Sequence, residues 1–128
     1  MFYVICSMFH DFMIICLTTE GKNLNSLLAT HFEKSKYFLF VDEKRKELEV
    51  IPNKPNGQLS VHLVAEKGPD LVITGNIGPS TYDFLKASGV KIVSGVFGIT
   101  AKRALEKYKK GEIKVIRHIP GAGRGRTL

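Results

Sequence analysis

The sequence predicts an α/β fold with a five-stranded mixed sheet, and three observations carry this prediction. Residues 13–19 form a continuous β-branched and apolar run, which is typical of a central strand covered on both faces. Residues 37–41 and 48–51 are two short strand-like runs joined by a charged turn, the pattern of a hairpin. After Pro52, helical and strand patterns alternate, which favours parallel strands joined by right-handed crossovers.

The alternating region begins with a short helix over residues 58–67. Gly68 and Pro69 follow it and form a stop signal, because glycine accepts the left-handed conformation that ends many helices. Residues 71–74 then form a short apolar run, which predicts a buried strand.

Two further helices flank the last expected strand, residues 90–93. The first begins with Pro79 at its first position and is closed by Gly89. The second runs over residues 100–110, with Thr100 as its N-cap and Gly111 as its terminator. This element order is close to a ribonuclease H-like fold with three layers, in which helices pack against a five-stranded mixed sheet.

Length and composition indicate one globular domain. The 128 residues are 44% hydrophobic and 24% charged, with a formal net charge of +7. We divide the chain into an N-terminal extension (1–12), a domain (13–116) and a flexible basic tail (117–128) that carries three arginines. The positive charge favours anionic partners and does not by itself distinguish nucleic acid, phosphate and an anionic cluster.

The two cysteines, Cys6 and Cys16, do not form a Cys-x-x-Cys pair. We therefore expect a reducing, cytoplasmic location, with Cys16 as a buried and inert thiol. The apolar stretch at residues 1–12 is interrupted by His10 and Asp11 before it could span a bilayer, so we expect no membrane association.

Three loops are expected to meet at one edge of the sheet if strands 13–19, 71–74 and 90–93 are parallel. Open α/β sheets bind ligands at this edge, and the glycine-rich loops 75–79 and 94–98 lead into helices whose N-termini favour anions. The candidate ligand-binding residues from these loops are Thr19, Gly75, Asn76, Gly78, Ser94, Gly95 and Gly98.

Charged side chains add three candidates. Lys102 and Arg103 lie in the first turn of the last helix, where positive charge opposes the helix dipole, so their position suggests a site that attracts negative charge. His31 is the histidine expected in a loop near the edge of the sheet where these loops meet. It is our candidate metal ligand, because one imidazole can complete the coordination of a preassembled cluster that brings its own sulfide ligands.

The segments TTEGKNLNS, HFEKSKYFLFVD, LVAEKGPDLVITGNIGP, LKASGVKIVSG and ALEKYKKGEIK resemble the dinitrogenase iron-molybdenum cofactor biosynthesis family, which includes NifX-type carriers and the C-terminal domain of NifB-type proteins. The likeness covers residues 13 to about 114 and is strongest at EKGPDLVITGNIGP. It implies a ribonuclease H-like fold without nuclease activity. It also implies binding or transfer of an iron-molybdenum cofactor or its iron-sulfur precursor, with cluster-assembly proteins as partners.

The chain departs from the family pattern at three places. Glu33 follows His31 and Phe32 where the family usually has glycine, and Lys102 and Arg103 replace a commonly acidic pair. The loop 52–58 is short and lacks the frequent histidine and glycine-rich stretch. Fewer candidate ligands therefore remain than in a typical member.

Other function classes fit the sequence less well. A ribonuclease H-type nuclease needs clustered carboxylates near its central strands, and residues 13–19 contain none. A Gly-x-Ser-x-Gly hydrolase elbow is absent, so we expect no enzyme activity and no catalytic residues. The alternative is a nucleic-acid-binding or regulatory protein-interaction module that uses the basic surface. Nucleic acid is disfavoured, because most aromatic residues fall within apolar runs rather than on a stacking platform.

Overall fold

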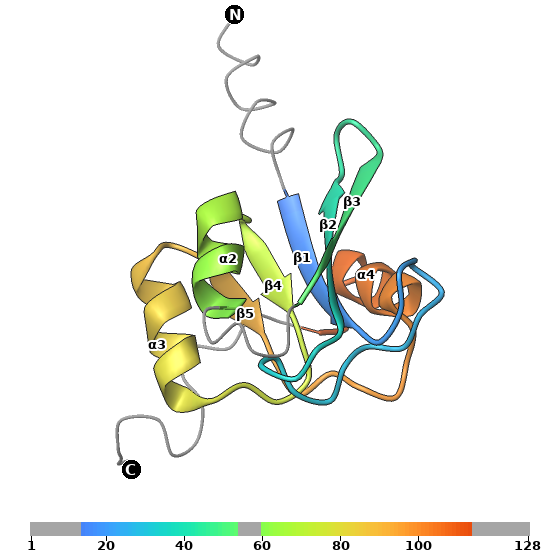
Figure 1. Cartoon of the computed structure of the whole chain (residues 1–128). Helices are drawn as coiled ribbons and strands as arrows, with labels where there is room; N and C mark the ends of the chain where they lie inside the picture. Colours follow the sequence, from blue (N-terminus) through green and yellow to red (C-terminus); the bar gives the residue numbers. More distant parts are fainter. Residues whose placement is uncertain (1–13, 54–59, 114–128) are drawn as a thin grey trace, which may run out of the picture.

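A computed structural model describes residues 14–53 and 60–113. The expected extension (1–12), the expected basic tail (117–128) and the first two residues of the helix expected at 58–67 lie outside these ranges. Within them, the chain forms an α/β fold with a five-stranded mixed sheet and three helices, as the sequence predicts (Figure 1).

The sheet has the strand order β3-β2-β1-β4-β5. The antiparallel pairs are β1 with β2 and β2 with β3, whereas β1 with β4 and β4 with β5 are parallel. The strands are β1 (Ile14–Thr19), β2 (Tyr37–Asp42), β3 (Glu47–Pro52), β4 (Leu71–Ile73) and β5 (Lys91–Val93). The hairpin predicted at 37–51 and the parallel pairing predicted for the later strands are both confirmed.

The central strand β1 is buried on both faces. Successive side chains of a strand point to opposite sides, so neighbouring residues pack in different apolar clusters. Cys16 belongs to one apolar cluster together with Phe38 and Val72. Its neighbours Ile15 and Leu17 belong to a second cluster on the other face. The apolar run at the start of the domain therefore has the central position that its composition predicts.

The three helices cover both faces of the sheet. Figure 1 shows α2 (Ser60–Lys67) and α3 (Pro79–Ala87) on one side and α4 (Ala101–Lys109) on the other. Val64 of α2 and Leu85 of α3 pack in the cluster that contains Cys16, whereas Ala104 of α4 packs in the opposite cluster. The described part of the chain thus has three layers.

The helix ends follow the sequence signals. Pro79 is the first residue of α3, and the helix is followed by Gly89 with a φ of 88°. Thr100 caps α4 through its side chain, which accepts a hydrogen bond from the Arg103 backbone. Gly111, with a φ of 78°, follows α4 and provides the left-handed residue predicted there. Among the described residues, no helix is long and apolar enough to cross a membrane.

Candidate functional site

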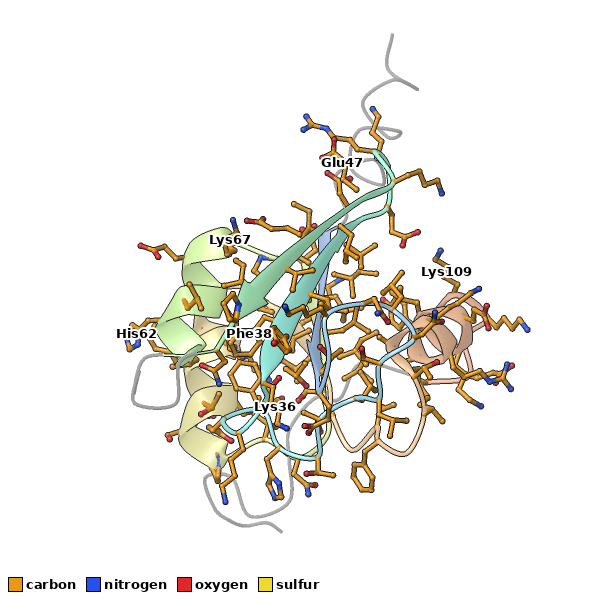
Figure 2. The ribbon with its side chains drawn as sticks, turned by 45° about the vertical axis from the view of Figure 1, so that its right-hand side comes forward. Lys36, Phe38, Glu47, His62, Lys67 and Lys109 are labelled. Atoms are coloured by element: carbon orange, nitrogen blue, oxygen red, sulfur yellow. The ribbon has the colours of Figure 1, made fainter. Side chains whose placement is uncertain are left out.

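The parallel strands β1, β4 and β5 end at the same edge of the sheet. The segments that follow them, residues 20–36, 74–79 and 94–100, converge at the bottom of the view in Figure 1, and we call this region the loop edge. Figure 2 shows Lys36 at the loop edge and Glu47 at the opposite end of the molecule, at the turn of the β2–β3 hairpin. The sequence predicts a ligand site at the loop edge.

His31 and Asn76 form an isolated parallel bridge at this edge. The Asn76 N–H donates to the Thr30 carbonyl oxygen at 2.7 Å, and the Phe32 N–H donates to the Asn76 carbonyl oxygen at 2.8 Å. Bridge partners in parallel segments project their side chains to the same side, and both residues are exposed. Two predicted site residues that are 45 positions apart therefore lie side by side on the surface.

The close approach of these two segments depends on Gly75. A Cβ atom at this position would lie 2.5 Å from the carbonyl oxygens of both Ala29 and Thr30. Backbone atoms cannot move aside as a flexible side chain can, so only glycine fits here. Gly75 is buried, and its role is to let the His31 segment pack against the end of β4.

The third loop, residues 94–100, is joined by backbone hydrogen bonds to the segment that follows β4. The Gly95 N–H donates to the Gly75 carbonyl oxygen at 2.8 Å, and the Val96 N–H donates to the Thr74 carbonyl oxygen at 3.1 Å. Gly95 and Gly98 have positive φ angles of 79° and 84°, and a Cβ at either would meet open space. These two glycines shape the loop through their backbone conformation.

The backbone of His31 is fixed although its side chain is exposed. Phe32 is fully buried, and its ring packs against that of Phe38 with 5.5 Å between the centroids. The Thr30 hydroxyl lies 3.2 Å from Nδ1 of His31. Among the contacts of the described residues, this leaves Nε2 as the ring nitrogen available to a ligand. In the tautomer that carries its proton on Nδ1, the hydroxyl accepts from Nδ1–H and the Nε2 lone pair can bind a metal.

The N-terminus of α3 already holds an anion from the chain itself. One carboxylate oxygen of Glu33, Oε2, accepts a hydrogen bond from the Thr81 hydroxyl at 2.6 Å and from the Gly78 N–H at 3.3 Å. Gly78 has no side chain with which to cap the helix, and the Glu33 carboxylate bonds instead to the N–H of this N-cap residue and to the Thr81 side chain. A carboxylate of the chain itself therefore lies at the helix start where the sequence predicts an anionic ligand.

The first N–H groups of α4 are also bonded within the protein. Those of Ala101 and Lys102 donate to the carbonyl oxygens of Ser26 and Leu24 at 2.9 and 2.8 Å. The Arg103 N–H donates to the Thr100 hydroxyl at 3.1 Å. These bonds join the N-terminus of α4 to the loop after β1, within the loop edge.

Thr19 has a comparable bonding role. It is fully buried, and its hydroxyl donates to the Gly21 carbonyl oxygen at 2.8 Å. Its own carbonyl oxygen accepts from the Ser35 hydroxyl at 3.2 Å and from the Lys36 N–H at 3.1 Å. Thr19 therefore joins both ends of the loop that contains His31. Ser94, another candidate, is half-buried at the start of the third loop.

Lys102 and Arg103 take part in contacts away from the His31–Asn76 bridge. Lys102 lines a groove of about 300 Å³ between α4 and the β2–β3 hairpin, together with Asp42 and Lys109. The Arg103 guanidinium lies 3.7 Å from a carboxylate oxygen of Glu106, one turn along α4. The structure does not bring this pair together with His31 in the contacts that it describes.

Sequence reasoning missed two contacts of the site, those made by Thr30 and by the Glu33 carboxylate. A hydroxyl next to a candidate histidine is a signal that could have pointed to Thr30, because metal-binding histidines commonly have a hydrogen-bonded partner at the second ring nitrogen. The contact between Glu33 and Thr81 joins residues 48 positions apart, and no local pattern announces it.

The described residues contain no group of three or more His, Cys, Asp or Glu side chains that could hold a metal ion. Cys16 is a buried free thiol in the core, as predicted, and burial raises its pKa.

The exposed imidazole of His31 thus lies on glycine-shaped loops at the carboxyl edge of the parallel strands in a small α/β fold. The family model described as "Dinitrogenase iron-molybdenum cofactor" matches residues 13–111. The chain belongs to this family, and the resemblance seen in its sequence is confirmed.

Solved structures share the fold. The apo form of the orange protein from Desulfovibrio gigas superposes with a TM-score of 0.76 at 23% identity, covering 84% of this chain and 95% of the other. A NifB candidate from Thermotoga gives 0.75 at 24% identity, with coverages of 85% and 97%. A candidate dinitrogenase protein from Methanocaldococcus jannaschii gives 0.67 at 19% identity, with coverages of 84% and 98%. A comparison with curated proteins gives no match.

Proposed function

We propose that this protein binds and carries an iron-sulfur or iron-molybdenum cluster, either the finished cofactor or a precursor, during metallocluster assembly. In this proposal the protein is a carrier rather than an enzyme. The family to which the chain belongs supports a place in iron-molybdenum cofactor biosynthesis. Cluster-assembly proteins that deliver or accept the cluster would then be its partners.

The observation that carries the proposal is the exposed imidazole of His31 on a fixed backbone. Phe32 anchors the segment in the core, the bridge to Asn76 sets its position, and the Thr30 hydroxyl holds Nδ1. A ligand held in this way loses little conformational freedom when it binds, which favours affinity.

The chemistry of the cargo matches one protein ligand. An iron-sulfur cluster brings bridging sulfides, so an imidazole nitrogen has only to fill one open position on a metal. An exposed site also lets the cluster leave, as transfer to an acceptor requires. The net charge of +7 supplies long-range attraction for an anionic cluster without a dedicated charge partner at the site.

Two further inferences accompany this function. We infer a ribonuclease H-like fold without nuclease activity, supported by the strand order β3-β2-β1-β4-β5 and by helices on both faces. We also infer a reducing, cytoplasmic location, supported by the buried free thiol of Cys16.

The proposal is tested by anaerobic gel filtration of the full chain after incubation with isolated iron-molybdenum cofactor or with an iron-sulfur precursor cluster. Iron and protein should elute together, close to one cluster per chain. Parallel samples with duplex DNA and with RNA test the nucleic-acid alternative. Salt-sensitive retention of nucleic acid together with loss of the cluster on the column would replace the carrier function by nucleic-acid binding.

A further inference from the structure

We propose that Glu33 is a positioning residue for the cluster ligand His31, because it ties the loop that presents the imidazole to the start of α3. This proposal rests on the proposed function for its ligand, whereas its geometry stands on the structure alone. Glu33 lies two residues after His31, and its carboxylate meets α3 at Gly78 and Thr81.

The geometry of the contact is specific. The Thr81 hydroxyl, at 2.6 Å, and the Gly78 N–H, at 3.3 Å, both donate to the same carboxylate oxygen, Oε2. Thr81 is buried with 8% of its surface exposed, so its hydroxyl needs an internal partner. A bond between a carboxylate and helix N-terminal donors is charge-assisted and favoured by the helix dipole.

The tie completes a set of attachments around His31. On the N-terminal side, the Thr30 carbonyl oxygen accepts from the Asn76 N–H. On the C-terminal side, the Asn53 side-chain amide donates to the Ser35 carbonyl oxygen at 2.8 Å. Between these points, Phe32 enters the core and Glu33 reaches α3. The carboxylate therefore extends the attachment of the His31 segment along the 74–79 loop, from the bridge at Asn76 to Gly78 and the first turn of α3.

The consequence is a division of roles between neighbouring residues. His31 binds the cluster, and Glu33 limits the orientations that the imidazole ring adopts. When the tie is absent, the His31 ring samples more orientations and more conformational entropy is lost on binding, so affinity falls while the fold remains. The carboxylate also places negative charge at the start of α3, which disfavours an anionic ligand there.

The test compares the full-length protein with Glu33→Gln and Glu33→Ala. Since both donors meet one oxygen, a glutamine carbonyl can accept both hydrogen bonds, whereas alanine can accept neither. We expect Glu33→Ala to weaken retention of isolated iron-molybdenum cofactor or precursor cluster about tenfold, and Glu33→Gln to restore it to within about threefold of the parent. Asp83→Ala, at an exposed carboxylate on α3, serves as the charge-matched control and should leave retention unchanged.

A second measurement needs no cluster. In ¹⁵N NMR spectra of the apo protein, the His31 ring signals should move toward those of a mobile histidine in Glu33→Ala, and stay near the parent in Glu33→Gln. Unchanged ring signals and retention in Glu33→Ala would overturn the proposal, as would equal loss of retention in both variants. If the parent binds no cluster, the carrier function fails, and the ring signals still decide whether Glu33 positions His31.

Discussion

The hydroxyl groups of Thr18 and Thr74 lie 2.8 Å apart in the interior, at the point where β1 and β4 reach the loop edge. Both residues are fully buried, so each hydroxyl depends on the other for its hydrogen bond. The bond joins the central strand to the residue that precedes Gly75, and it lies directly beneath the segments that position His31.

Thr18→Val should destabilise the protein by about 1–3 kcal/mol, because the Thr74 hydroxyl then stays buried without its partner. The double variant Thr18→Val/Thr74→Val should recover much of this loss, since both polar groups are removed together. Urea unfolding of the parent, the two single variants and the double variant measures the coupling. Additive losses would show that the two hydroxyls do not depend on each other.

Gly75→Ala should both destabilise the protein and disturb the His31 segment, because the new Cβ would meet the backbone oxygens of Ala29 and Thr30. We expect a loss of about 2 kcal/mol or more in unfolding free energy, in the range typical of strained backbone sites. Gly78→Ala is the matched control. Its φ is −71° and its nearest neighbour is the flexible Glu33 carboxylate, so it should lose far less stability.

Most of the fold could be predicted from the sequence because its signals are local. The apolar run at 13–19, the proline at the start of α3 and the Thr100 cap each act within a few residues, and each appears in the structure where it was expected. The parallel pairing of β1 with β4 and of β4 with β5 was expected from element type, because helices between strands favour parallel neighbours.

The candidate site was predictable only in part. That His31 and Asn76 belong to one edge followed from parallel topology, but their pairing depends on hydrogen bonds between segments 45 residues apart. The helix starts were expected to be open to an anion, but the first N–H groups of α4 donate to two carbonyl oxygens of the loop after β1, and the Glu33 carboxylate lies at the start of α3. A helix N-terminus can be recognised in a sequence, whereas the long-range partner that satisfies it cannot.

Thr30→Val should weaken cluster retention about tenfold and leave the fold intact, because it removes the hydroxyl that lies beside Nδ1 of His31. Thr30 is exposed, so the methyl group of valine needs no space in the core. Thr30→Ser keeps the hydroxyl and should retain the cluster as the parent does. Anaerobic gel filtration compares the three proteins, and equal retention in Thr30→Val would remove the hydroxyl from the site.

Stability should fall at alkaline pH through Cys16. Burial raises the pKa of this thiol above its ordinary value of 9.0, so above that pH the unfolded chain releases a proton that the folded chain keeps. The stabilising contribution is complete below pH 9 and declines above it, with a slope of up to about 1.4 kcal/mol per pH unit. Unfolding of the parent and of Cys16→Ala between pH 8 and about pH 10.5 measures this, and equal slopes would contradict it.

Cluster retention by His31→Ala, compared with His62→Ala, tests the carrier function most directly. Both histidines are exposed, and Figure 2 shows His62 projecting outward from α2, where its ring packs 4.5 Å from that of Phe84. We predict that His31→Ala loses at least about tenfold in retention of the isolated cluster on anaerobic gel filtration, while its thermal unfolding stays close to that of the parent. His62→Ala should retain the cluster fully. Equal retention by the two variants at equal stability would contradict the role of His31 as the cluster ligand.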